Sequence, residues 1–195
     1  MTEKAIQILK KNTLGFFLLV EGGRIDHGHH ANSAIKALSE LSSFDDAVAK
    51  GVDTTNEKDT LIIVSADHSH VFNIAGYPTR GTDILDKVPR DPVNKGPTDD
   101  MPMTVLVYGN GPGYTPQRAN LTNVDTTLKK YLQQSAVPLA DETHGGKDVV
   151  AYARGPMSHL ISGVKEQNYL AVEVFVVLIA PKKKYRVDKS FSLLY

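Results

Sequence analysis

Short apolar runs and amphipathic stretches alternate along the chain. The amphipathic stretches carry apolar residues at helical spacing, which predicts helices at residues 2–12 and 31–50. The apolar runs have the length of strands and lack polar alternation, which is typical of strands buried on both faces of a sheet, although a short buried helix also fits residues 16–20. The strands predicted in this way lie at residues 16–20, 61–64, 104–108 and 149–152.

Two segments fall outside this alternation. Residues 21–30 are rich in Gly and His and predict a turn between the first strand and the long helix. Residues 73–102 contain repeated prolines, glycines and charges of both signs, which predicts an inserted irregular lobe. Because the remaining strands alternate with helices, we expect the α/β fold class, with a mostly parallel sheet covered by helices.

Composition restricts the classes of function. Of the 195 residues, 41% are hydrophobic, so the chain can bury a sizeable core as one domain or as a domain with a small lobe. The 22 basic and 22 acidic residues balance, which argues against a nucleic-acid partner. No segment approaches the roughly 18 apolar residues of a membrane span, and the N-terminus lacks the layout of a signal peptide. The chain has no Cys, so a bound metal ion must be held by His, Asp or Glu.

Most of the histidines are concentrated in three short segments, at residues 21–30, 66–70 and 143–146. The first two segments directly follow a predicted strand. Because ligands bind at the carboxyl ends of the strands in open α/β sheets, we expect these segments to converge. Their glycines permit tight turns and a close approach of the backbone to a ligand. The sequence therefore predicts a ligand site built from the three segments.

The side chains in these segments are typical metal ligands. Asp26 and His30 have the i, i+4 spacing that places two ligands on one face of a helix. With His144 as a third ligand they would form a zinc site with one open position, which is the arrangement of catalytic zinc. Asp67 and His68 offer a second pair nearby. Two metal ions about 4 Å apart are suited to phosphoryl transfer.

Each of these signals also has a simpler interpretation. A single Asp-His pair is more often a hydrogen-bonded histidine or a helix cap than a ligand set, and residues 26–30 alone also fit a polar surface turn. Glu21 offers the oxygen ligand that Mg²⁺ prefers, but on its own it would be a solvated carboxylate. The metal interpretation is favoured because three such segments are expected to meet.

Longer runs of the sequence resemble a known family. Residues 15–30 closely resemble the metal-binding motif of animal-type alkaline phosphatases, and residues 76–81 resemble the start of the crown insertion of that family. Over residues 1–170 the resemblance implies an alkaline-phosphatase-like, doubly wound, mostly parallel sheet flanked by helices, with a crown-like lobe at about 73–102. The other matching runs follow in the same order at residues 65–72, 134–139, 142–146, 154–157 and 163–169.

This resemblance implies zinc- and magnesium-dependent hydrolysis of phosphate monoesters through a phosphoserine intermediate. It implies that Asp26, His30 and His144 are the three protein ligands of one Zn²⁺, which would activate the water that hydrolyses the phosphoenzyme. It also implies that Asp67 and His68 are two ligands of a second Zn²⁺, which would hold and activate the serine oxygen.

Other active-site residues of the family have no counterpart in this chain. Glu21 corresponds to one ligand of Mg²⁺, whereas the remaining magnesium ligands, the serine nucleophile and the phosphate-binding arginine lie upstream in the family. We therefore expect residues 1–170 to be the C-terminal part of an alkaline phosphatase domain, with no catalytic nucleophile in this chain. Residues 171–195 are expected to form a divergent tail that lacks the apolar end of a lipid-anchor signal.

Two hypotheses about function follow from the resemblance. In the first, the chain is part of an alkaline phosphatase that acts on phosphate monoesters as a homodimer at the cell surface or outside the cell, where the family is often lipid-anchored. In the second, it is a truncated and catalytically inactive zinc-binding fragment, or the pairing partner of an intact subunit. In a secreted chain, Asn120 would be a glycosylation acceptor because it begins an Asn-Leu-Thr triplet.

Overall fold

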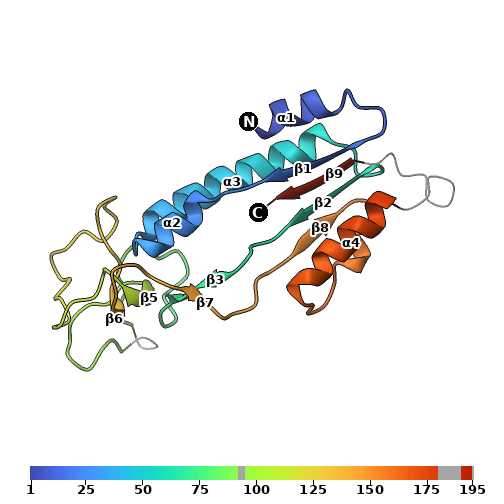
Figure 1. Cartoon of the computed structure of the whole chain (residues 1–195). Coiled ribbons are helices and arrows are strands. Elements are labelled where there is room, and N and C mark those ends of the chain that lie inside the picture. Colours follow the sequence, from blue (N-terminus) through green and yellow to red (C-terminus); the bar gives the residue numbers. More distant parts are fainter. Residues whose placement is uncertain (92–94, 180–189, 195) are drawn as a thin grey trace. The chain divides into compact units, whose positions relative to one another are not determined.

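The computed structural model describes residues 1–91, 95–179 and 190–194, and the chain divides into two compact units. Helix α3 (Ala34–Thr54) contributes residues to both of them (Figure 1). Unit 1 comprises Met1–Gly22, Ser42–Asp67 and Val149–Tyr195, and unit 2 comprises Gly23–Leu41 and His68–Asp148.

Unit 1 is built around a mixed four-stranded sheet with the strand order β1-β9-β2-β8. Strands β1 and β2 pair in parallel with β9, one on each side, and β8 pairs antiparallel with β2. Helices α1 and α4 and the 3-10 helix η1 accompany this sheet. In chain order the elements are α1 (Thr2–Leu9), β1 (Phe16–Val20), β2 (Thr60–Val64), β8 (Tyr152–Arg154), η1 (Ser158–Leu160), α4 (Gln167–Ile179) and β9 (Ser190–Leu194).

The core of unit 1 lies where β2 meets α4. Leu61 and Ile63 of β2 are almost fully buried and pack with Val174 of α4. Four consecutive side chains of β2, from Thr60 to Ile63, are buried. A strand covered on both faces needs no polar alternation, which explains why its sequence is a continuous apolar run.

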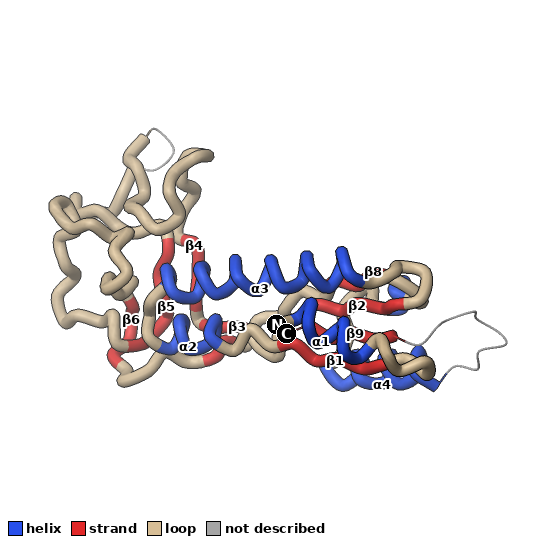
Figure 2. Tube along the Cα trace, turned by 90° about the horizontal axis from the view of Figure 1, so that it is seen from above, coloured by secondary structure: helices blue, strands red, loops and turns tan. Residues whose placement is uncertain are grey.

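Unit 2 contains helix α2, the N-terminal part of α3 and two small sheets. In one sheet β3 and β7 pair antiparallel, and in the other β5 lies between an antiparallel β4 and a parallel β6. Most of the backbone between β4 and β5 is loop (Figure 2). The bounds are α2 (Arg24–His30), β3 (Ser69–His70), β4 (Phe72–Ile74), β5 (Leu106–Gly111), β6 (Ser135–Pro138) and β7 (His144–Gly145).

The link between α2 and α3 fixes helix α2 within unit 2. Asn32 is fully buried and has a φ of 50°, a conformation that Asn tolerates better than most residues. Its side chain accepts a hydrogen bond from the Gly113 N–H at 2.7 Å and donates one to the Asn110 carbonyl at 3.1 Å. This short polar side chain therefore ties the end of α2 to the end of β5.

Several helices and strands lie where the sequence predicts them, and some differ. Residues 21–30, predicted as a turn, contain helix α2, because the glycine at position 28 fits against α3 instead of ending the helix. The strand expected at 104–108 begins at Leu106, and the strand expected at 149–152 lies at Tyr152–Arg154. The described residues form an α/β protein with three sheets: a four-stranded sheet with two parallel pairings and one antiparallel pairing, a three-stranded sheet with one pairing of each kind, and one antiparallel pair.

The irregular lobe and the tail lie partly outside the described residues. After β4 ends at Ile74, the lobe expected at 73–102 has no helix or further strand among its described residues, and positions 92–94 are not described. The tail expected at 171–195 contains the C-terminal part of α4 and strand β9, and positions 180–189 and 195 are not described. No helix among the described residues is both long and apolar enough to cross a membrane.

Candidate metal centre

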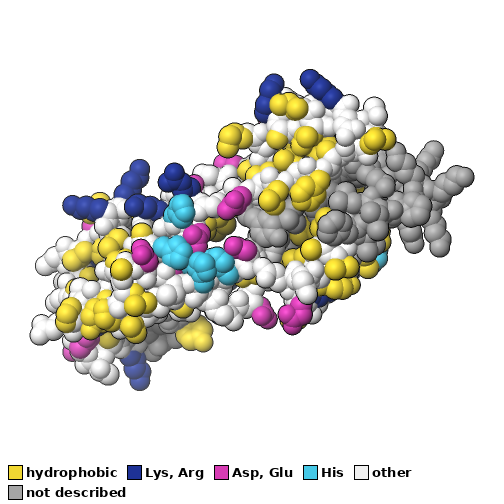
Figure 3. Space-filling view, viewed as in Figure 1, with side chains coloured by type: hydrophobic (Ala, Val, Ile, Leu, Met, Phe, Trp, Pro, Cys, Tyr) yellow, Lys and Arg dark blue, Asp and Glu magenta, His cyan; other side chains and the backbone are white. Residues whose placement is uncertain are grey.

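Histidine side chains gather at one place in unit 2 (Figure 3). Helix α2 contributes Asp26 and His30, which are one helical turn apart. The paired strands β3 and β7 bring His70 and His144 opposite each other, because these two residues are register partners in the antiparallel pair. His68 lies immediately before β3. One helix and one two-stranded sheet thus position all five side chains.

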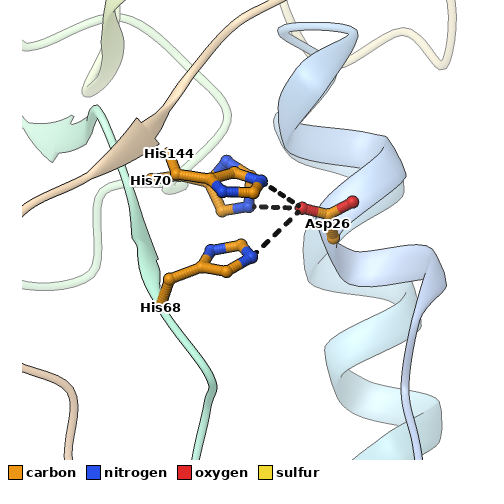
Figure 4. Close-up of side chains that lie close together, drawn as sticks. All are labelled: Asp26, His68, His70 and His144. Atoms are coloured by element: carbon orange, nitrogen blue, oxygen red, sulfur yellow. Dashed lines mark ion pairs between the residues drawn. The ribbon is translucent and has the colours of Figure 1, made fainter.

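One carboxylate oxygen, Asp26 Oδ1, lies at the centre of this group. Figure 4 shows three of the imidazole rings directed at it from the opposite side. The distances from Asp26 Oδ1 are 3.1 Å to His70 Nε2, 3.2 Å to His30 Nε2, 3.3 Å to His144 Nε2 and 3.8 Å to His68 Nε2. The oxygen is buried, yet it has no hydrogen-bond partner among the described residues.

This orphaned oxygen is the observation that fits a metal ion. A buried carboxylate oxygen is costly unless it is hydrogen-bonded or coordinates a cation. Here several imidazole nitrogens surround it at short distance without hydrogen-bond geometry. The donor set consists of imidazole nitrogen and carboxylate oxygen without thiolate, which is the chemistry of catalytic zinc. Two overlapping sets have ligand atoms close enough to share an ion: Asp26, His68, His70 and His144, and His30, His70 and Glu142.

The charge on Asp26 depends on its histidine neighbours. Burial alone would raise the pKa of the Asp26 carboxyl group, but the interaction with the surrounding histidines is stronger, and the pKa lies below its usual value of 3.8. The histidines that lower it are, in order of effect, His30, His70, His144 and His68. Asp26 is therefore ionised at neutral pH and can balance part of the charge of a bound cation.

The ring of His70 is stacked on a second histidine, His29, which packs among aromatic rings. The ring of His29 stacks on that of His70, with 4.6 Å between centroids, and its Nδ1 lies 2.9 Å from the hydroxyl oxygen of Tyr108. Burial, followed by the nearby His70, lowers the pKa of His29 to about 4. Burial also raises the pKa of Tyr108 above its usual value of 10.0. Phe72 contacts the rings of His29 and Tyr108, so the ring that stacks on His70 is itself held between two further aromatic rings.

The structure brings together four of the predicted site residues. Asp26, His30, His68 and His144 all belong to unit 2 and meet at Asp26 Oδ1. The other two predicted metal ligands, Asp67 and Glu21, are exposed residues of unit 1.

Two residues of the centre were not assigned from the sequence. His70 is buried against Asp26, and Glu142 is buried against His70. His70 stands in one of the histidine-rich segments, and Glu142 stands directly before another, so their positions were the available signal. Their mutual contact depends on the pairing of β3 with β7, and strands of two residues leave no hydrophobic pattern.

The fold and the site define an α/β protein with a histidine- and carboxylate-rich centre suited to a metal ion. The family model of alkaline phosphatase matches residues 1–180, so the chain belongs to the alkaline phosphatase family, as the motifs predicted. Over 173 residues, or 87% of this chain, it is 52% identical to the tissue-nonspecific isozymes of alkaline phosphatase from Rattus norvegicus and Mus musculus, and 51% identical to that from Homo sapiens. It spans about a third of these curated relatives, 32% of the length of each.

Proposed function

We propose that this chain supplies zinc and magnesium ligands to an alkaline phosphatase that hydrolyses phosphate monoesters through a phosphoserine intermediate. Membership of the family supports the reaction class. The observation that carries the proposal is the buried oxygen Asp26 Oδ1, which faces the Nε2 atoms of His30 and His144 without a hydrogen-bond partner among the described residues.

The proposed roles follow the family motifs residue by residue. Asp26, His30 and His144 would hold one Zn²⁺, and Asp67 and His68 would provide two ligands of a second. A bound zinc ion supplies Lewis-acid stabilisation of the charge that develops on the phosphoryl oxygens.

The described side chains support the first of these ligand sets. The His30 Nδ1 lies 2.5 Å from the carbonyl oxygen of Glu142, and because a carbonyl only accepts hydrogen bonds, Nδ1 carries a proton. In the neutral ring this leaves the lone pair on Nε2, the atom that faces Asp26. The carboxylate contributes a negative charge, and the imidazoles contribute neutral nitrogen donors.

Three further proposals rest on the family and on exposed residues. Glu21 would be one ligand of Mg²⁺, and the intact enzyme would be a homodimer. In a secreted protein Asn120 would be a glycosylation site: it is exposed, and its Oδ1 accepts hydrogen bonds from the N–H and hydroxyl of Thr122 at 3.0 and 2.6 Å, the second residue after it in the triplet.

Calorimetric titration of the metal-free 195-residue chain with Zn²⁺ tests the proposal. We expect binding that is weakened at least about 10-fold by His144→Ala, because a three-ligand site loses one ligand. His159→Ala is the matched control, since this exposed histidine lies in unit 1 and belongs to none of the three histidine-rich segments. Equal zinc binding by His144→Ala and by the parent would contradict the proposed ligand set.

The second test is hydrolysis of an aryl phosphate by the same chain with Zn²⁺ and Mg²⁺ present. The motifs of this chain supply ligands and no nucleophile, so we expect zinc binding without turnover through a phosphoserine. Turnover comparable to that of an intact alkaline phosphatase, with a phosphoserine trapped in this chain, would contradict the proposal. It would show that the chain supplies a nucleophile as well as metal ligands.

A further inference from the structure

Glu142 is the most deeply buried carboxyl group beside the metal centre. Only 1% of the residue is exposed, and it directly precedes the Thr143-His144 segment that leads into β7. A buried carboxyl group is costly unless its oxygens are satisfied. Its Oε1 accepts a hydrogen bond from the Val71 N–H at 2.8 Å, and its Oε2 lies 2.6 Å from His70 Nδ1.

The main chain of the same residue holds a second ring of the centre. The Glu142 N–H donates to the carbonyl of His30 at 2.8 Å, and the Glu142 carbonyl accepts from His30 Nδ1 at 2.5 Å. Glu142 therefore contacts two imidazole rings at the same ring atom, Nδ1. Its backbone makes the hydrogen bonds to His30, and its side chain makes the short contact with His70, with Oε2 also 3.9 Å from His30 Nδ1.

These contacts at Nδ1 determine where the other ring nitrogens point. The Nε2 atoms of His30 and His70 lie 3.2 and 3.1 Å from Asp26 Oδ1. An imidazole ring turns about its Cβ–Cγ bond. A hydrogen bond at Nδ1 restrains this rotation, so the Nε2 atom on the other side of the ring stays directed at the centre. Carboxylate or carbonyl partners of this kind orient the histidines of metal sites and are a large part of their affinity.

We propose that Glu142 is a positioning residue of the metal centre, which aims His30 by its main chain and His70 by its side chain at the oxygen of Asp26. This inference rests on the proposed metal site. It goes beyond it by assigning a role to a residue that is not among the proposed zinc or magnesium ligands.

The substitution Glu142→Gln separates the two contacts. An amide has one oxygen and one NH₂ group, and the Val71 N–H requires an acceptor, so the amide oxygen should face Val71 and the NH₂ group should face His70. The NH₂ group only donates, so the Nδ1 of His70 must change from a donor to an acceptor. His30 is held by the main chain of residue 142 and should keep its proton on Nδ1.

The experiment compares the metal-free parent with Glu142→Gln by nitrogen-proton NMR of the imidazole rings, and both proteins by calorimetric titration with Zn²⁺. We expect the Nδ1 of His70 to lose its proton while His30 is unchanged. We also expect zinc affinity to fall at least about 10-fold, because His70 belongs to both groups of side chains whose ligand atoms are close enough to share an ion, and partners of metal-bound histidines contribute about this much to affinity. The control is Glu57→Gln, the same change at an exposed ion pair with Arg154 in unit 1, which should alter neither measurement.

Two results would overturn the inference: an unchanged His70 ring in Glu142→Gln, or a zinc affinity within about twofold of that of the parent. A parent chain that binds no Zn²⁺ would refute the proposed function, and the NMR comparison would then decide the role of Glu142 alone. If Glu142→Gln does not fold, the NMR spectrum of the parent tests the contact by itself. A proton on the His70 Nδ1 supports the proposed contact with Glu142, and the absence of that proton excludes it.

Discussion

The Nε2 atoms of His30 and His144 lie 3.2 Å apart, although 114 positions separate the two residues. His30 donates from its Nδ1 to the carbonyl of Glu142, so in the neutral ring its Nε2 carries a lone pair. A nitrogen lone pair that faces a second imidazole nitrogen and the oxygen of Asp26 is satisfied by a cation or by a proton. This arrangement predicts that the stability of unit 2 depends on whether a metal ion is bound.

The first prediction is that Zn²⁺ stabilises the chain against unfolding. A ligand that binds only the folded state at 100 times its Kd adds about 2.7 kcal/mol to the free energy of unfolding. We expect a gain of about this size in urea unfolding with Zn²⁺, its reversal by a chelator, and its loss in His30→Ala. His159→Ala serves as the control and should respond as the parent does, because it is an exposed residue of unit 1. An equal gain in His30→Ala would place the zinc elsewhere.

The second prediction concerns pH. The pKa of His29 in the folded chain is about 4, against 6.5 for an unperturbed histidine, because burial disfavours the charged ring. Between these two values the unfolded chain binds more protons than the folded one. The contribution of His29 to the free energy of unfolding is therefore complete above about pH 6.5 and declines as the pH falls towards about 4, with a slope of at most about 1.4 kcal/mol per pH unit.

The variant His29→Phe isolates this contribution, because Phe keeps an aromatic ring beside Phe72 and His70 but cannot titrate. Urea unfolding at about pH 7 and about pH 5, with a chelator present, should show a smaller loss of stability in the variant than in the parent. All other groups titrate in both proteins, so an identical loss in the two would show that His29 is not held in its neutral form.

The third prediction tests the contact between α2 and α3. A Cβ atom on Gly28 would lie 2.5 Å from the backbone nitrogen of Ala37 and 2.9 Å from its Cα, and a backbone cannot move aside as a flexible side chain can. We expect Gly28→Ala to lower the free energy of unfolding by about 1–3 kcal/mol and to weaken zinc binding, because α2 carries Asp26 and His30. Gly146→Ala is the control, since nothing lies within 4 Å of its added Cβ atom. Unchanged stability in Gly28→Ala would mean that the helices are not in this close contact.

Burial and spacing could be predicted from the sequence where the pattern involves several residues of the same helix or strand. The continuous apolar run of β2 predicted a strand covered on both faces, and its buried side chains from Thr60 to Ile63 confirm this. The i, i+4 spacing of Asp26 and His30 implied one helical face, and α2 contains both residues. The family itself was identified from the motifs, and the family model confirms it.

Features that depend on pairing between distant segments could not be predicted. Gly28 lies within a run of histidines that reads as a turn, and only its contact with Ala37 explains why a helix contains it. The roles of His70 and Glu142 arise from the pairing of β3 with β7, where each strand has two residues and no period to detect. Strand β9 lies between β1 and β2, a position in the sheet that no local pattern in the tail indicates.

The last prediction concerns Asn32, a fully buried residue that combines a positive φ with two partly buried hydrogen bonds, to Gly113 and to Asn110. Asn32→Gly keeps the backbone conformation at no steric cost but leaves a partly buried N–H and a partly buried carbonyl without the Asn partner, which costs at most about 1–3 kcal/mol for each group. Asn32→Ala loses the same hydrogen bonds and also forces a Cβ atom into the left-handed region, at a further 1–2 kcal/mol or so.

We therefore expect the free energy of unfolding to decrease in the order parent, Asn32→Gly, Asn32→Ala, as measured by urea unfolding without metal. Asn120→Ala is the control, because that side chain is exposed and, in the described part of the chain, its hydrogen bonds are to Thr122 of its own turn. If Gly and Ala at position 32 were equally destabilising, the backbone conformation would contribute nothing and the hydrogen bonds alone would hold α2 to β5. If Gly were neutral, the hydrogen bonds would be unimportant and the role of Asn32 would be to permit the bend between α2 and α3.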